Sequence, residues 1–234
     1  MDTNKNDSMN QNYIDVIYDE KSKPLTDYPH KLTAHLIKKF NISKNSNLLD
    51  VGCGRGDFLN GFISAGLSGY GVDFTNAAEK YCPDAKLFQA DIENNGMPFD
   101  DNYFDVIFSK SVIEHFHDPD ILIKECKRCL KPGGLIIVMA PSWEYNYRIY
   151  FEDYTHRTPF MKTSMQDILN MHDFDNINVS FFKQLPILWG SWRFIFTPIS
   201  FLTQVFIPRF FSSKFKWVRF SREIMLIGTA NKSK

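Results

Sequence analysis

A glycine-rich turn between two apolar segments, residues 48–59, most constrains the fold of this chain. Its sequence is Leu-Leu-Asp-Val-Gly-Cys-Gly-Arg-Gly-Asp-Phe-Leu, and the apolar run at Leu48–Val51 stops at three alternating glycines. Phe58, Leu59 and Phe62 then follow at helical spacing. The pattern predicts a buried strand, a tight turn and a helix, the unit that brings backbone amides close to a nucleotide-like ligand.

The three glycines of this turn are Gly52, Gly54 and Gly56. They allow positive φ and carry no Cβ that would keep a ligand away. A nicotinamide-dependent oxidoreductase would need a further glycine where Asp57 stands, so the dinucleotide fingerprint fits poorly. The stretch instead closely resembles the D-x-G-x-G-x-G turn of the class I S-adenosylmethionine-dependent methyltransferases. That resemblance implies that Asp50 and the glycines bind S-adenosylmethionine.

Three further motifs carry the same resemblance. They are Pro-Phe-Asp followed by Phe-Asp-Val-Ile at residues 98–107, Ile-Glu-His at 113–115, and Leu-Lys-Pro-Gly-Gly at 130–134. Together with the glycine turn, these motifs extend the resemblance over residues 30–183 and the last strand. The resemblance implies the fold and the cofactor of that family.

A second predicted strand ends at Asp73, 21 residues after Gly52. Nucleotide-binding βαβ units place an acidic residue at about this offset, roughly 20 residues on, where its carboxylate accepts hydrogen bonds from the ribose hydroxyls. The alternative role for Asp73 is that of a helix cap. Phe74 follows, at a position where an apolar side chain can lie against an adenine face.

Two later strand ends add candidate cofactor contacts. Asp91 and Ile92 end the strand that follows Asp73 in the chain. The resemblance implies that the Asp91 carboxylate accepts from the adenine amino group and that the Ile92 N–H donates to the ring. Ser109 closes the next strand, at the carboxyl edge where open α/β sheets place their ligands.

Strand and helix patterns alternate from residue 47 to residue 139. They predict an α/β, Rossmann-like, doubly wound sheet with right-handed crossovers. A sixth strand at 177–182 and a last strand at 223–230, antiparallel to its neighbours, complete seven. Residues 29–183 with 223–234 are therefore expected to form the cofactor-binding domain. Ser164 is the predicted cap of a short helix before the sixth strand.

The N-terminal residues are polar and predict a flexible segment over 1–28. The helix predicted over His30–Phe40 is similar to the family's helix that lies across the cofactor pocket, with Tyr18, Tyr28 and His30 as candidate lids. The alternative is a helix that only covers the sheet edge. The start of the chain has no apolar region typical of a signal peptide, which predicts a cytoplasmic protein.

Net charge and cysteine positions argue against nucleic-acid binding, a disulfide scaffold and a cysteine metal site. The formal net charge is +0, so the chain gives no case for nucleic-acid binding, which needs a basic face. Four scattered cysteines do not predict a disulfide scaffold. Cys126 and Cys129 lie on the apolar stripe of a predicted helix, which favours core packing over a zinc or redox pair. The sequence therefore predicts no metal site.

The resemblance also implies a chemistry. Methyl transfer from a sulfonium is an in-line displacement in which positioning supplies most of the effect. A hydroxyl acceptor must in addition lose a proton, and the candidate bases are His115 and His156, ahead of His117. Glu114 or Asp153 is a candidate to orient one of them. The alternative is that these histidines are structural.

Residues 184–222 form a predicted insertion before the last strand. Eleven Trp and Phe residues lie between Trp189 and Phe220, and seven Lys and Arg residues but no acids lie between Asn176 and Arg222. This composition is typical of an interfacial helix on anionic lipid, and also of a pocket cap or a homodimer face. Polar and proline residues interrupt every window of about 20 residues, so a transmembrane helix is not predicted.

Residues 153–160 and 219–226 are similar to bacterial methyltransferases associated with surface-polysaccharide assembly. That similarity implies O-methylation of a small-molecule or glycan hydroxyl, on a lipid-linked or nucleotide-linked intermediate. The protein would then be cytoplasmic or peripheral at the inner face of the membrane. Two alternatives remain: a lipid or quinone-type acceptor, and a non-catalytic cofactor-binding partner subunit that keeps residues 50–92 without turnover.

Overall fold

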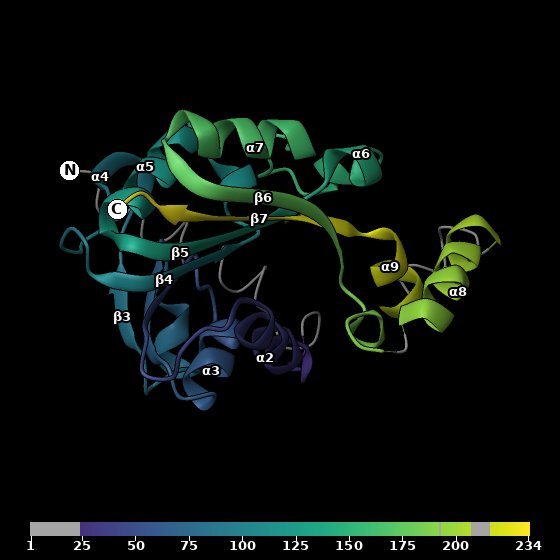
Figure 1. The fold of residues 1–234 in the computed structure, drawn as a ribbon, viewed down its shortest axis with the longest axis horizontal. Helices are drawn as coiled ribbons and strands as arrows, with labels where there is room; N and C mark the ends of the chain where they lie inside the picture. The colour runs from purple at the N-terminus through teal and green to yellow at the C-terminus, as the bar shows by residue number, and fades with distance from the viewer. Residues whose placement is uncertain (1–23, 192, 207–215) are drawn as a thin grey trace.

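The computed structural model describes residues 24–191, 193–206 and 216–234, which form a sheet with helices on both faces (Figure 1). The seven strands lie in the order β3-β2-β1-β4-β5-β7-β6. They are β1 (Asn47–Val51), β2 (Ser68–Asp73), β3 (Lys86–Gln89), β4 (Phe104–Lys110), β5 (Leu130–Pro141), β6 (Phe174–Lys183) and β7 (Ile224–Lys232). β1 to β5 pair in parallel, whereas β7 is antiparallel to β5 and β6. This arrangement confirms the predicted Rossmann-like sheet with an antiparallel last strand.

Helices cover the two faces of the sheet in separate layers. The α-helices are α2 (Tyr28–Phe40), α3 (Asp57–Ser64), α4 (Ile92–Asn95), α5 (Pro119–Cys129), α6 (Trp143–Asn146), α7 (Lys162–Met171), α8 (Arg193–Phe206) and α9 (Lys216–Arg222). The 3-10 helices are η1 (Ala77–Lys80), η2 (Ile113–His115), η3 (Tyr150–Glu152) and η4 (Pro186–Leu188). α2 and α3 lie on one face, and α5 and α7 on the other (Figure 1).

Burial on both faces explains the composition of the central strands. In β1, Leu48 packs in the core under α2 and α3, whereas Leu49 packs in the core under α5 and α7. Phe108 and Ile107 of β4 divide between the two cores in the same way. Parallel strands that are covered on both faces are nearly continuous in apolar residues, which is the pattern that made these strands predictable.

The core also settles the role of the cysteine pair. Cys126 and Cys129 lie on the inner face of α5, are free thiols and have 0% exposed surface. At the start of the same helix, the Asp118 carboxylate accepts a hydrogen bond from Asp120 N–H at 3.1 Å, and Pro119 occupies the first turn. The predicted core packing of the two cysteines is confirmed.

The start of β5 differs from the prediction. Residues 131–134 predict a turn before a strand at Leu135, but β5 begins at Leu130, which pairs with Phe104. The register then shifts, and regular pairing resumes between Val106 and Leu135. The predicted turn is therefore an irregularity within the strand, because the residues on both sides of it pair with β4.

The start of α7 also differs. The helix begins at Lys162 rather than just after Ser164, and Ser164 is its third residue. The Ser164 Oγ accepts a hydrogen bond from Met161 N–H at 2.9 Å. A polar side chain at the third position commonly reaches back to the N–H before the helix, so Ser164 stabilises the helix start from inside the first turn.

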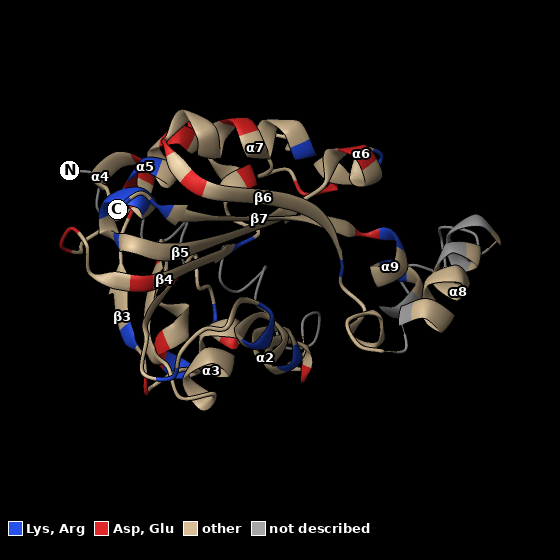
Figure 2. Ribbon diagram, in the orientation of Figure 1, with Lys and Arg blue, Asp and Glu red and all other residues tan. Residues whose placement is uncertain are grey.

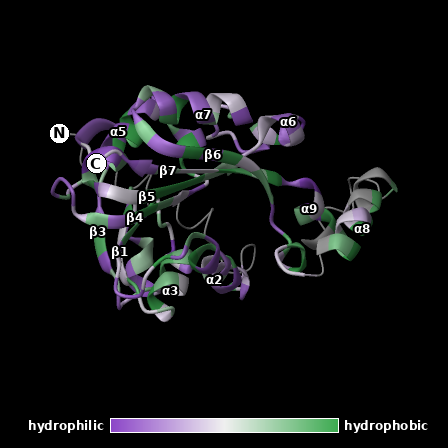
Figure 3. Ribbon diagram, viewed as in Figure 1, coloured by the Kyte–Doolittle hydropathy of each residue, from purple (hydrophilic) through white to green (hydrophobic). Residues whose placement is uncertain are grey.

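The insertion is attached to α2 at both of its described ends. Trp189 stacks on His35 with ring centroids 4.9 Å apart, and its Nε1–H donates to the Lys183 carbonyl at 2.8 Å. Tyr28 stacks on Phe220 at 5.6 Å. Between these anchors α8 lies beyond the end of the sheet (Figure 1) and carries hydrophobic residues (Figure 3). None of the described helices is both long enough and apolar enough to cross a bilayer.

Several predictions concern residues outside the described ones. Residues 1–23 belong to the predicted flexible segment and contain the candidate lid Tyr18. Trp192 and residues 207–215 also lie outside the described residues. Residues 207–215 contain three of the aromatic residues of the predicted insertion, Phe210, Phe211 and Phe215. In the described part, Lys, Arg, Asp and Glu are interspersed over helices and loops (Figure 2). The division into 29–183 with 223–234 and an insertion at 184–222 remains a prediction.

The contact between α2 and α3 gives a test of the packing. A Cβ on Gly61 would meet the Oγ1 of Thr33 and lie 3.0 Å from its Cγ2. Thr33 is fully buried and stiff at χ1 because it is β-branched. Gly61→Ala is therefore expected to lower the free energy of unfolding by about 1–3 kcal/mol, although alanine favours a helix over glycine.

Denaturant unfolding followed by circular dichroism measures this effect. Gly190→Ala is the control, because no heavy atom lies within 4 Å of a Cβ built there. A Gly61→Ala protein as stable as the unmodified chain would contradict the close approach of the two helices.

Candidate cofactor and acceptor site

The predicted site residues gather at the carboxyl ends of β1, β2 and β4. The glycine turn follows β1, Asp73 ends β2, and Ser109 lies near the end of β4. Because these strands are parallel neighbours, their carboxyl ends meet at one edge of the sheet. The topology therefore brings together residues that the sequence spreads over 60 positions between Asp50 and Ser109.

The glycine turn has the backbone that its sequence predicts. Gly52, Gly54 and Gly56 have φ of 69°, 54° and 81°, the left-handed region that glycine favours. A Cβ on Gly52 would collide with Val112, and one on Gly56 would lie 2.8 Å from the Cβ of Cys82. Gly52 and Gly56 thus let the turn pack closely against Val112 and Cys82, where a side chain would not fit.

Asp73 is tied to the turn by its carboxylate. Its Oδ2 accepts a hydrogen bond from Gly54 N–H at 2.8 Å, and its Oδ1 accepts from the N–H and the hydroxyl of Thr75, both at 2.9 Å. A carboxylate oxygen has two lone pairs, so Oδ2 keeps one for a ligand. Asp73 therefore joins the ends of β1 and β2 and still presents an acceptor at the edge of the sheet.

Asp50 lies beneath the turn and is 2% exposed. Its Oδ2 has no hydrogen-bond partner among the described residues. Burial, and then the nearby Asp73, raise the pKa of Asp50 well above its usual range. Ser109 is similarly buried, and its hydroxyl also has no partner in the described part of the chain. Two of the predicted site residues are thus buried polar groups that protein atoms leave unsatisfied.

Asp91, a predicted adenine contact, also has a structural role at the start of α4. The Asp91 carboxylate caps α4, accepting from Asn94 N–H at 3.2 Å and from Asn94 Nδ2 at 2.8 Å. Ile92 buries its side chain in the core, which leaves its backbone N–H as the group for a ligand. Phe74 is 47% exposed beside them. The sequence reasoning did not anticipate the cap at Asp91, although Asp before a short polar helix is a recognisable signal.

The structure brings the two favoured histidines together. His115 belongs to η2 and His156 to the loop after η3, and their ring centroids lie 4.9 Å apart. The Glu114 carbonyl holds this loop in place, because it accepts hydrogen bonds from Arg157 N–H at 2.8 Å and Thr158 N–H at 3.1 Å. The third candidate, His117, is exposed, and its N–H donates to Glu93. The structure therefore separates His117 from the pair.

Hydrogen bonds set the orientation of both rings. The Thr155 hydroxyl lies 2.5 Å from Asp153 Oδ1 and 2.9 Å from His115 Nδ1. A carboxylate only accepts, so the hydroxyl donates to Asp153 and accepts from a protonated His115 Nδ1. His156 Nδ1 lies 2.6 Å from the Tyr150 carbonyl, which also only accepts. In the neutral rings both protons sit on Nδ1, and each Nε2 keeps its lone pair.

The surroundings of the pair favour an uncharged His115 and a charged Asp153. Burial, and then His156, lower the pKa of His115. Burial acts to raise the pKa of Asp153, but the Thr155 hydroxyl and amide and the two histidines lower it overall. Asp153 thus orients His115 through Thr155, a version of the predicted orienting role that passes through a third residue.

Glu114 is buried and Lys110 is half-buried, and both are ionisable groups near the histidine pair. Burial raises the pKa of Glu114 to about 8 and lowers the pKa of Lys110 to about 8, and each charge opposes the shift of the other. The Lys110 Nζ lies 5.3 Å from the centre of the Phe58 ring, next to the glycine turn. Lys110 was not a predicted site residue, although its place after Ser109 at a strand end pointed to the site.

The two described lid candidates lie away from the histidine pair. Tyr28 packs on Trp189 and Phe220, and its hydroxyl donates to Gln184 at 3.3 Å. His30 is exposed and lines a small cleft of about 190 Å³ with Asp57. Tyr28 therefore fixes the insertion to α2, and His30 lies beside the start of α3.

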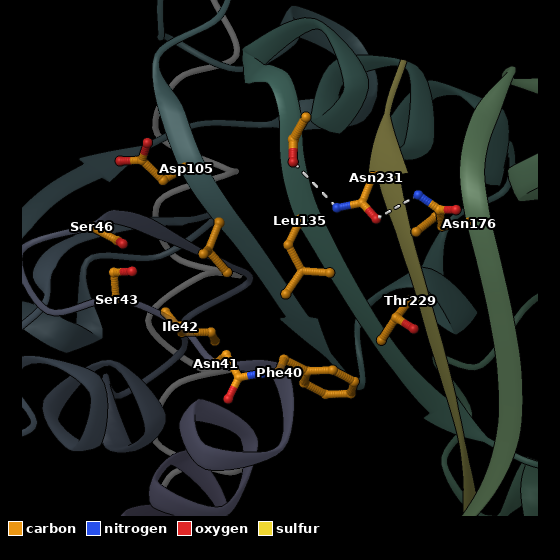
Figure 4. Close-up of a pocket in the computed structure, with 13 residues that line it drawn as sticks. Phe40, Asn41, Ile42, Ser43, Ser46, Asp105, Leu135, Asn176, Thr229 and Asn231 are labelled. Carbon is orange, nitrogen blue, oxygen red and sulfur yellow. Dashed lines mark hydrogen bonds between the residues drawn. The ribbon is translucent and has the colours of Figure 1, made fainter. Parts of the chain in front are cut away.

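A larger cleft lies at the opposite edge of the sheet (Figure 4). It has a volume of about 430 Å³ and is lined by residues such as Ser46, Asp105 and Asn231. The Asn231 side chain bonds to the Gly133 carbonyl at 3.2 Å. Because this cleft is at the amino ends of β1 and β4, it shares no residue with the glycine turn or the histidine pair. We therefore place the candidate site at the carboxyl edge.

Comparison with known proteins identifies similar methyltransferases. Residues 49–138 match the protein family described as a methyltransferase domain. Over 156 residues the chain is 30% identical to a demethylmenaquinone methyltransferase of Staphylococcus carnosus, an alignment that covers 59% of this chain and 64% of that protein. The chain thus spans less than two thirds of this relative.

Two solved structures share the fold. One is a SAM-dependent methyltransferase from Archaeoglobus fulgidus, with a TM-score of 0.64 and 21% identity over 93% of this chain and 99% of that one. The other is phosphoethanolamine N-methyltransferase 2 of Haemonchus contortus in complex with S-adenosyl-L-methionine, with a TM-score of 0.62 and 20% identity over 87% of this chain and 52% of that one.

Proposed function

We propose that this chain, whose residues 49–138 match a methyltransferase domain family, is a class I S-adenosylmethionine-dependent methyltransferase. It would transfer a methyl group from S-adenosylmethionine to a hydroxyl of an acceptor bound beside His115 and His156. One observation carries the proposal. The glycine turn and the oriented histidine pair meet at the same carboxyl edge of the sheet, although the turn and the loop of His156 lie far apart in the sequence.

The residues at this edge fit the cofactor. The glycine turn exposes backbone without side chains at the carboxyl edge, and the buried Asp50 Oδ2 lacks a partner among the described residues. The remaining lone pair of Asp73 Oδ2 suits a ribose hydroxyl, and the exposed Phe74 ring suits an adenine face. Asp91 and the Ile92 N–H would complete the adenine contacts, with Asp91 also serving α4. When bound, S-adenosylmethionine supplies a methyl group already activated on a sulfonium.

Asp73 provides a test of the cofactor site. Asp73→Ala is expected to weaken S-adenosylmethionine binding by ~1.5–3 kcal/mol, the scale of a lost hydrogen bond to a charged group. Isothermal titration calorimetry measures the affinity, and circular dichroism checks that the variant folds.

The exposed Asp84 supplies a control, since Asp84→Ala removes an acid of the same type from the surface. Equal affinity in the unmodified chain and in a folded Asp73→Ala variant would remove Asp73 from the site.

The histidine pair accounts for the second requirement of the reaction. A neutral hydroxyl is a weak nucleophile, and removal of its proton in the transition state contributes typically 10²- to 10⁴-fold. With both Nδ1 atoms engaged, each ring presents an Nε2 that can accept that proton. The hydrogen bonds to Thr155 and Tyr150 hold the rings in place, so little reorganisation is needed.

His115→Ala and His156→Ala are the variants that test this step. We expect at least one of them to lower turnover by ~10²–10⁴-fold with donor affinity unchanged. The assay incubates the protein with methyl-labelled donor and separate lipid and surface-precursor fractions, and mass spectrometry identifies the methylated species.

His117→Ala is the matched control, because His117 is exposed outside the pair. If both single variants keep near-normal turnover on the identified acceptor, the pair has no part in proton removal.

The class of acceptor has two candidates. The similarity of residues 153–160 and 219–226 to polysaccharide-associated methyltransferases favours a glycan hydroxyl in surface-polysaccharide biosynthesis. The demethylmenaquinone methyltransferase relative favours a quinone- or lipid-type acceptor instead. The labelled fractions distinguish the two. A protein that binds the donor and methylates neither fraction would instead be a non-catalytic partner subunit.

The exposed face of α8 supports contact with a membrane. Ile195, Ile199, Leu202 and Phe206 are 55%, 43%, 50% and 74% exposed. Their spacings of four, three and four residues place them on one helical face. Contiguous exposed apolar side chains mark interaction surfaces. Together with the acid-free, basic composition of 176–222, this face suits an anionic lipid surface that a lipid-linked acceptor would occupy. A pocket cap and a homodimer face are the alternatives.

Co-sedimentation with anionic vesicles tests this contact. The unmodified chain is expected to bind at low salt and to be released only in part as salt rises, because screening weakens the ionic share and leaves the apolar share. Replacing Leu202 and Phe206 together by Ser should remove most of the salt-resistant binding.

Leu25→Ser is the control, since Leu25 is 60% exposed but lies outside α8. If the unmodified chain ignores anionic vesicles at low salt, α8 covers the acceptor pocket or a second subunit.

A further inference from the structure

Glu114, His115 and His156 converge at the acceptor side of the site. One possible ligand atom from each of the three lies within 4.8 Å of the other two. η2 supplies the first two residues and the loop after η3 supplies the third. The sequence prediction of no metal site considered the cysteines, and it did not bring these three residues together because their approach depends on the folded loop.

The three side chains have ligand atoms that no protein contact uses. Both histidines use Nδ1–H toward Thr155 and the Tyr150 carbonyl, which leaves their Nε2 lone pairs for a ligand. The Glu114 side chain is 0% exposed, and neither of its carboxyl oxygens has a hydrogen-bond partner among the described residues. A buried carboxyl group without a partner, beside two imidazole lone pairs, is an unsatisfied polar site.

Within the described ranges of the chain, the neighbouring charged side chains make no hydrogen bond to the free ligand atoms of this cluster. Asp153 Oδ2 lies 3.9 Å from His156 Nε2, which is too long for a hydrogen bond. Lys110 is the cation that acts on Glu114, and Arg157 is the cation that acts on His115. The Lys110 Nζ is directed to Ser111 Oγ at 3.5 Å, and no ion pair joins Lys110 or Arg157 to Glu114 in the described part of the chain. The Glu114 carboxyl therefore has no ion-pair partner among the described residues.

We infer that Glu114, His115 and His156 bind one divalent transition-metal ion. Two imidazoles and a carboxylate form a three-ligand set that suits zinc, cobalt or iron and leaves a coordination position open. The hydrogen bonds from each Nδ1 to a carbonyl or hydroxyl are the outer contacts that orient metal-binding histidines. The inference rests on the proposed function in one respect: the free coordination position of the ion would face the acceptor that the proposed function places beside the two histidines.

An ion at this place would act on the acceptor hydroxyl. Metal coordination lowers the pKa of a bound water molecule from 15.7 to about 7, and a coordinated alcohol becomes more acidic for the same reason. The histidine pair would then act by holding the ion, and the hydroxyl proton would leave to solvent. His115 and His156 would thus promote loss of the hydroxyl proton through the ion, and the unpaired Glu114 carboxyl group would be a ligand of that ion.

The experiment titrates metal into the full chain after removal of bound ions with a chelator. Calorimetry with Zn²⁺ and visible absorption with Co²⁺ report binding without any need for the acceptor. One ion per chain is expected, with the intense visible bands of a four- or five-coordinate cobalt site. Glu114→Gln and His156→Ala should each weaken binding at least ~100-fold, and Thr155→Val, which removes an outer contact, by ~10–100-fold.

Two controls separate loss of the metal site from loss of the fold. His117→Ala should bind metal like the unmodified chain, and circular dichroism checks the fold of each variant. Because Glu114 is buried, the half-buried His156 supplies the second variant in case Glu114→Gln does not fold. Absence of saturable binding, or binding that both variants retain, overturns the inference.

The failure of the inference and the failure of the proposed function give different results. Methyl transfer that persists in the metal-free chain, together with no metal binding, would remove the ion and leave the methyltransferase. Specific metal binding in a chain that methylates neither fraction would keep the metal site and reject the proposed function.

Discussion

The hydrogen bond from Gly54 N–H to the Asp73 carboxylate is the contact on which the cofactor side of the site depends. It joins the turn after β1 to the end of β2. The turn that donates it has left-handed backbone at Gly52, Gly54 and Gly56, and a side chain at Gly52 or Gly56 would collide with Val112 or Cys82. A substitution at any of these points would change both the shape of the turn and the direction of the carboxylate.

The acceptor side depends on a different kind of contact. The Glu114 carbonyl binds the N–H groups of Arg157 and Thr158 and thereby holds a loop from beyond β5 over the end of β4. Thr155 and His156 then reach His115, and Asp153 orients the ring through Thr155. One backbone anchor therefore places the histidine pair and leaves the Glu114 carboxylate directed to the same region.

Most of the fold could be predicted from the chain, since buried parallel strands are continuous in apolar residues and the glycine turn marks where β1 ends. The features that the sequence analysis did not anticipate were local. β5 begins at Leu130 because pairing with Phe104 outweighs the turn signal of residues 131–134. Ser164 supports α7 from inside its first turn, and Asp91 caps α4, because short side chains satisfy whichever backbone N–H lies closest.

The sequence by itself determined the sheet, the glycine turn and the residue types that suit a nucleoside, because these follow from local periodicity and from the backbone freedom of glycine. It also named His115 and His156 as candidates. Only the tertiary structure decided that these two rings meet, that Glu114 is buried beside them without a partner, and that His117 lies outside. The physical reason is that such contacts join segments far apart in the chain, so no local pattern records them.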